Sequence, residues 1–94
     1  MLKRNGNYTH VYNSPKIYAR ELREVTDELD KALRKWQGAP FNSPHEGLAV
    51  IHEEFDELKA EVWKREKKRQ VKRMRKEAIQ LAAMALRFAL ECAR

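Results

Sequence analysis

The sequence predicts an all-α protein: a three-helix subunit with a flexible N-terminal arm, pairing into an oligomeric helical bundle that is dimeric or tetrameric. Apolar residues recur at spacings of three and four in three segments, as on the buried face of an amphipathic helix. Two of these segments begin with serine followed by proline, and serine caps a helix whose first position suits proline. Because 94 residues make one small domain with little buried surface, we expect it to gain stability from further copies.

The first helix is expected to follow the arm, residues 1–13, and to open a single domain at 14–94. Ser14 is its candidate N-cap and Pro15 its first helical position. Gly38 and Pro40 end it, because neither residue continues a helix well. Its apolar positions are Tyr18, Leu22, Val25, Leu29, Ala32 or Leu33, and Trp36.

The second helix begins at a capping box, in which Ser43 precedes Pro44 and Glu46 follows three residues after the cap. Its predicted core stripe is Leu48, Ile51, Phe55, Leu58 and Val62. No glycine or proline marks its end, and one helix reaching the C-terminus would be unusually long. We therefore expect a turn between about Lys64 and Val71.

The third helix runs to the C-terminus and carries apolar residues on two faces. One face holds Met74, Ala78, Leu81, Ala85, Phe88 and Cys92, and the other holds Ile79, Leu86 and Leu90. A helix that is apolar on two faces is normally buried on both. One subunit has too few helices to cover both faces, so a second copy is expected, most simply through a two-fold interface.

The net charge of +6 is unevenly distributed along the chain. Residues 64–76 contain nine basic residues and one acidic residue, whereas residues 44–62 contain six carboxylates and one lysine. Cys92 is the only cysteine, and the N-terminus has no apolar signal-peptide region. The longest apolar run, Leu81 to Leu90, is interrupted by Arg87 and too short to span a bilayer. We expect a soluble cytoplasmic protein with no membrane partner.

Glutamates form a row beside the predicted core of the second helix, and two further oxygen-bearing side chains flank the core stripe of the third. If the two helices pack through their apolar stripes, these rows face each other and form an oxygen-lined site that suits Mg²⁺. A solvated helix face is the alternative, and spacing alone favours it. Lys59 is the only basic residue available to pair with the first row. The residues are Glu54, Glu57 and Glu61 on the second helix and Glu77 and Gln80 on the third.

Two stretches, HEGLAVIHEEFDEL and RMRKEAIQLAAMALRF, resemble the MazG-like all-α nucleoside triphosphate pyrophosphohydrolases. The signature of that family is E-x-x-E, a spacer, then E-x-x-D. Glu54 and Glu57 match its first half, and Glu77 begins the second half after nineteen intervening residues. Gln80 stands where the family has aspartate. The resemblance covers residues 43–88.

The resemblance implies a MazG-like helical domain that assembles as a dimer or a dimer of dimers. It implies hydrolysis of an NTP or dNTP to NMP and pyrophosphate with Mg²⁺, for which Mn²⁺ can substitute. Glu54, Glu57 and Glu77 would hold the metal, and one carboxylate would orient or deprotonate the attacking water. Gln80 would be a neutral fourth ligand, unless Glu53 or Asp56 takes that place. A non-catalytic MazG-like oligomerisation module stays open as an alternative.

Other side chains are candidate substrate contacts. Lys72, Arg73 and Lys76 precede Glu77 closely enough to meet phosphates, although a solvated basic turn explains them equally well. Trp36 and Phe41 flank the first loop and either stack on a base or anchor the loop. A nucleic-acid-binding module using the basic segment 64–76 is a further alternative, which the absence of interleaved aromatic residues disfavours.

Overall fold

The computed structural model describes residues 17–94, which contain three α-helices and no strand. The helices are α2 (Ala19–Lys35), α3 (Pro44–Val62) and α4 (Val71–Cys92), and a short 3₁₀ helix, η1 (Glu66–Lys68), precedes α4. The predicted all-α class with three helices is confirmed. The predicted arm 1–13 and the Ser14 and Pro15 helix start lie outside the described residues. Among the described helices, none is both long and apolar enough to cross a membrane.

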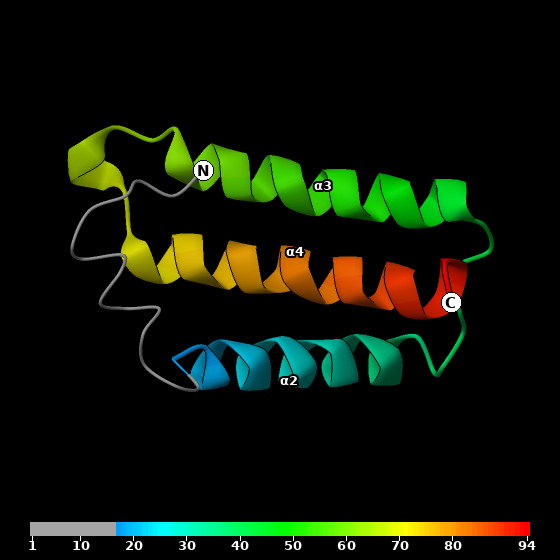
Figure 1. The fold of residues 1–94 in the computed structure, drawn as a ribbon. Helices are drawn as coiled ribbons and strands as arrows, with labels where there is room; N and C mark the ends of the chain where they lie inside the picture. Colours follow the sequence, from blue (N-terminus) through cyan, green and yellow to red (C-terminus); the bar gives the residue numbers. More distant parts are fainter. Residues whose placement is uncertain (1–16) are drawn as a thin grey trace.

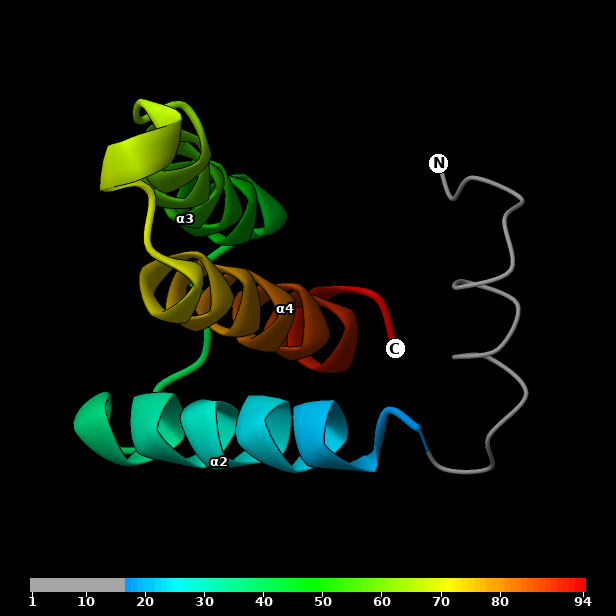
Figure 2. The ribbon, with the colours of Figure 1, turned by 90° about the vertical axis from the view of Figure 1, so that its left-hand side faces the viewer.

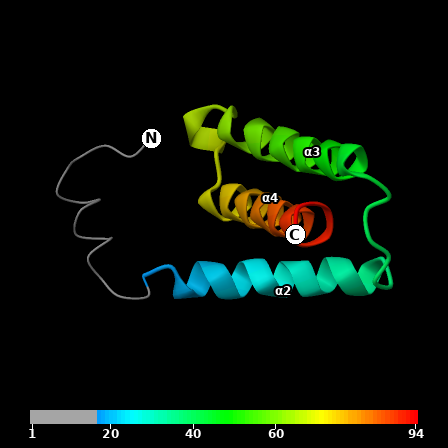
Figure 3. The same ribbon diagram turned by 45° about the vertical axis from the view of Figure 1, so that its right-hand side comes forward.

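The three helices lie side by side with α4 in the middle (Figure 1). Helix α4 packs against both neighbours, while α2 and α3 make no close contact with each other. Helices α3 and α4 run antiparallel, and α2 crosses them obliquely (Figures 2 and 3). Residues of all three helices line a groove between α2 and α3, with α4 as its floor.

Helix α2 begins at Ala19, and its N-cap residue Tyr18 makes no side-chain capping bond. Its end is as predicted: Gly38 has a positive φ of 73° and donates its N–H to the Leu33 carbonyl at 2.8 Å. Only the middle of its apolar stripe is covered, with Leu29 buried. The prediction was wrong for the ends, because α2 crosses α4 obliquely and three stripe residues there stay exposed: Tyr18, Leu22 and Trp36.

Helix α3 begins with the predicted capping box. The Ser43 hydroxyl accepts a hydrogen bond from the Glu46 N–H at 3.1 Å, and the Glu46 carboxylate accepts one from the Asn42 N–H at 2.8 Å. The buried face of α3 is rotated from the predicted stripe, because Gly47 lets α4 approach closely. A Cβ on Gly47 would lie 2.7 Å from the Phe88 ring.

This rotation corrects the predicted stripe of α3. Val50 and Ile51 pack against the core, whereas Leu48 is 60% exposed and Phe55 47% exposed. Val62 is exposed as well. The displaced apolar residues form an uncovered surface on the outer side of α3.

Helix α4 follows a turn at residues 63–70, as predicted. Ala83 is fully buried and Met84 nearly so, and together with Leu29 of α2 they form the core. The predicted stripe was only partly right. Met74, Leu81, Phe88 and Cys92 are half-buried, but Ala78 and Ala85 are exposed; in the second row Ile79 is half-buried, while Leu86 and Leu90 are exposed.

A buried ion pair fixes the α2–α3 loop to the end of α4. Arg87 is only 4% exposed and donates to the Glu91 carboxylate at 2.8 Å and to the Ala39 carbonyl at 2.9 Å. The Phe41 N–H donates to Glu91 at 2.7 Å, and the Arg87 guanidinium lies 3.9 Å from the centre of the Phe41 ring. Phe41 is therefore a buried residue that anchors the loop, and Arg87 holds it in place. In the sequence, Arg87 stands out only as a charged residue within the apolar run of the third helix.

Candidate metal centre

Three carboxylates converge where α3 and α4 pack together. Glu54 and Glu57 lie one turn apart on α3, and Glu77 lies on the facing side of α4. One oxygen from each carboxylate lies within 4.8 Å of the corresponding oxygens of the other two. The structure thus brings together the three glutamates that the sequence singled out. We call them the acidic cluster.

Among the described residues, no lysine, arginine or histidine forms an ion pair with the acidic cluster. Oε2 of Glu54 and Oε1 of Glu77 are buried and have no hydrogen-bond partner among the described residues. Burial, followed by the negative charges of Glu57 and Glu77, raises the pKa of Glu54 to about 7. Burial and the charge of Glu57 also raise the pKa of Glu77. Glu54 is therefore close to half protonated at neutral pH unless a cation is bound.

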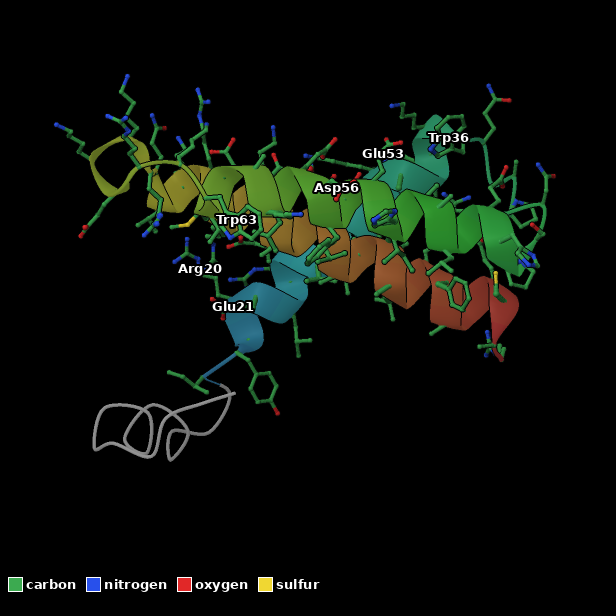
Figure 4. The ribbon with its side chains drawn as sticks, turned by 90° about the horizontal axis from the view of Figure 1, so that it is seen from above. Arg20, Glu21, Trp36, Glu53, Asp56 and Trp63 are labelled. Atoms are coloured by element: carbon green, nitrogen blue, oxygen red, sulfur yellow. The ribbon has the colours of Figure 1, made fainter. Side chains whose placement is uncertain are left out.

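Two further carboxylates of α3, those of Glu61 and Asp56, lie close to basic side chains outside the acidic cluster. Glu61, which the sequence placed in the same row, pairs with Lys64 at 2.9 Å. Asp56 is exposed on the side of α3 facing away from α4 and lies 3.8 Å from His52 (Figure 4). Neither side chain belongs to the group of converging carboxylates, although the charge of Glu61 contributes to the raised pKa of Glu77.

Gln80 lies one turn beyond Glu77 on α4 and is half-buried. Together with Glu53 and Glu54 it lines a groove of about 530 Å³ between α2 and α3. Trp36, directly after the end of α2, lines the other wall of this groove. Trp36 is thus exposed beside the groove, and the buried side chain of Met84 forms part of the groove floor.

The three predicted phosphate contacts lie on the other side of Glu77. Lys72, Arg73 and Lys76 line a second groove of about 850 Å³, and Glu77 lies in its wall. None of these three cations forms an ion pair within the described part of the chain. Their placement gives the acidic cluster a positively charged flank.

Two residues at this site were not predicted. Glu28 of α2 lines both grooves, and its carboxylate lies 4.0 Å from the Lys31 ammonium. Arg75 spans from α4 to α2, where its guanidinium donates to Glu21 and Glu24 at 2.9 Å and lowers the pKa of both carboxyls. Arg75 is therefore committed to joining α2 and α4. The spacing of Glu21, Glu24 and Glu28 on one side of α2 was the available signal.

The donor set of the acidic cluster suits a hard divalent cation. Mg²⁺ prefers carboxylate oxygens and keeps several positions for water and phosphate. The two buried oxygens without partners are the groups that a cation would satisfy, since a buried charge is costly until it is paired. No family model, curated protein or solved structure matches this chain.

Proposed function

We propose that the protein is a Mg²⁺-dependent nucleotide pyrophosphohydrolase that converts an NTP or dNTP to NMP and pyrophosphate. The observation that carries the proposal is the acidic cluster, in which oxygens of Glu54, Glu57 and Glu77 converge within 4.8 Å beside a groove. The match of these residues to the MazG-like signature supports it further. Mn²⁺ is expected to substitute for Mg²⁺.

Each part of the site has a role in this reaction. Glu54, Glu57 and Glu77 would hold the metal, and a cluster carboxylate would orient the attacking water by accepting its hydrogen bond. Bound Mg²⁺ would lower the pKa of that water and neutralise charge on the phosphoryl oxygens. Lys72, Arg73 and Lys76 would bind the phosphates, which the acidic cluster alone would repel. Trp36 would contact the base across the groove.

Gln80 is the position at which the chain differs from the MazG-like signature, which has aspartate there. Its amide oxygen can coordinate a metal but adds no negative charge and cannot act as a base. This residue favours, as a second candidate function, a MazG-like module that binds metal and nucleotide without hydrolysis. A Gln80→Asp variant that hydrolyses nucleotides while the wild type does not would identify a decayed catalytic site, and calorimetric binding of Mg²⁺ and nucleotide by the wild type would then support this second function.

Pyrophosphate release from a panel of canonical and modified NTPs and dNTPs tests the proposed function. We expect release with Mg²⁺ or Mn²⁺ and none in EDTA, because the carboxylates act through the metal. The nucleotide that is hydrolysed fastest identifies the preferred base and sugar. Absence of release from every nucleotide, with a folded protein and excess metal, would contradict a catalytic role.

We propose that a second copy of the chain covers the exposed apolar side of α3 and α4, giving a dimer or a dimer of dimers. His45, Leu48, Phe55 and Leu81 are among the residues that line a shallow apolar surface there. A small domain that leaves large apolar side chains exposed gains stability by covering them. Sedimentation equilibrium is expected to give the mass of two or four chains, and a monomer at micromolar concentration would contradict this.

A reducing cytoplasm suits a protein with a lone cysteine.

A further inference from the structure

The turn between α3 and α4 carries a cluster of cations beside an exposed tryptophan. We name it the basic tip and define it by Trp63, Arg65, Lys67, Lys68 and Arg69. We propose that the basic tip binds single-stranded nucleic acid, at a surface separate from the acidic cluster. Trp63 is 74% exposed and directly precedes the cations in the chain, so an aromatic ring and positive charge share one end of the molecule (Figure 4).

The charge of the basic tip is not neutralised by the protein. Within residues 17–94, two cations of the basic segment 64–76 form ion pairs, namely Lys64 and Arg75. Neither residue belongs to the basic tip. Residues 1–16 contain no aspartate or glutamate, so they have no carboxylate side chain to supply. The one acidic residue within the stretch is Glu66. Repulsion among the tip cations therefore favours binding of a polyanion.

The fold holds the tip in a defined shape. Arg69 donates from Nε to the Val62 carbonyl at 3.0 Å, which satisfies a carbonyl at the end of α3. The η1 backbone is closed by a hydrogen bond from the Lys68 N–H to the Arg65 carbonyl at 2.7 Å. A turn with this geometry presents its lysines without the ordering cost that a disordered basic segment would incur on binding.

Trp63 selects the kind of polyanion. The Lys59 ammonium lies over its ring, 4.5 Å from the centre. A cation on one face leaves the opposite face for a nucleobase, and stacking on tryptophan requires a base that is not already stacked in a duplex. This geometry favours a single strand over a double helix.

An anionic membrane surface fits the basic tip less well. Interfacial binding requires an apolar face that enters the headgroup region. The η1 segment consists only of Glu66, Lys67 and Lys68, and the large exposed apolar side chains beside it are Trp63 and Val71. This area is small, so the tip has charge for a lipid surface but little to insert.

Titration of a fluorescein-labelled oligothymidylate of about 15 nucleotides, in EDTA and at several salt concentrations, tests the proposal. EDTA removes divalent cations, so failure of the proposed hydrolysis does not affect the result. The double variant Lys67→Gln/Lys68→Gln is expected to lower the slope of log affinity against log salt by about 1.4, because each cation contributes about 0.7 on a single strand. Trp63→Ala is expected to weaken binding about tenfold.

The matched control is the double variant Arg34→Gln/Arg94→Gln, which removes two exposed cations outside the tip. Its salt slope is expected to equal that of the wild type. In a Trp36→Phe background, quenching of Trp63 fluorescence by the oligonucleotide would support stacking. The proposal is overturned if the wild type does not bind, if both double variants lose the same slope, if Trp63→Ala binds normally, or if a duplex binds as tightly. Tip-dependent binding to phosphatidylserine vesicles but not to the oligonucleotide would also overturn it.

Discussion

Replacement of Glu57 by glutamine is expected to lower the rate of pyrophosphate release at least 100-fold at saturating Mg²⁺. Glutamine keeps the shape of the side chain but removes one of the three negative charges that would hold the cation. Glu57 is the exposed member of the acidic cluster, so the substitution leaves the packing between α3 and α4 unchanged. The loss is therefore expected in kcat at an unchanged melting temperature.

Asp56→Asn is the matched control for this variant. It removes the same charge from the preceding residue of α3, but Asp56 is exposed and its carboxylate lies 3.8 Å from the His52 ring nitrogen. Its rate of pyrophosphate release is expected to stay within about twofold of the wild type, since a charge far from the reacting phosphates is screened by solvent. Full activity in Glu57→Gln, or equal losses in both variants, would exclude the acidic cluster as the catalytic site.

Replacement of Arg87 by leucine is expected to cause the largest loss of stability in the molecule. The change leaves the Glu91 carboxylate buried without its cation, and it removes the hydrogen bond to the Ala39 carbonyl and the contact with the Phe41 ring. Breaking a buried ion pair from one side costs about 3 to 5 kcal/mol. In a domain of this size, about 1 kcal/mol shifts the melting temperature by about 4 to 8 °C. Thermal denaturation is expected to show a decrease of at least about 12 °C.

The double variant Arg87→Leu/Glu91→Leu distinguishes the unpaired charge from the lost packing. With both charged groups removed, part of the stability is expected to return, because no carboxylate remains buried without a cation. The Phe41 N–H loses its acceptor in this variant, so recovery stays incomplete. A melting temperature of the single Arg87→Leu variant equal to that of the wild type would show that the ion pair does not hold the loop.

Local sequence signals predicted most of the secondary structure. The capping box at Ser43 and Glu46 and the terminating Gly38 act within a few residues of themselves, so they could be identified without knowledge of the fold. The buried face of α3 could not. Apolar spacing places Leu48 and Phe55 in the core, but Gly47 allows Phe88 so close that a neighbouring face packs instead. That choice depends on contacts between helices.

The acidic cluster could be predicted because Glu54, Glu57 and Glu77 lie at helical spacings beside apolar stripes. Those spacings do not show which glutamates of the row form ion pairs. Glu61 belongs to the same row but pairs with Lys64. Glu28 and Arg87 were missed for a different reason. Both lie near the site because α2 and its loop fold onto α4, a long-range contact that the helical spacing of the α2 glutamates does not specify.

Calorimetric titration of the protein with Mg²⁺ in the absence of nucleotide tests most directly whether the acidic cluster is a metal site. The wild type and Asp56→Asn are expected to bind Mg²⁺, and Glu57→Gln is expected to lose most of this affinity. Because the pKa of Glu54 is about 7, a proton competes with the metal there. Binding is therefore expected to be tighter at about pH 8 than at about pH 6, with protons released at the lower pH. Absence of binding in the wild type, or equal affinity in Glu57→Gln and Asp56→Asn, would contradict the assignment.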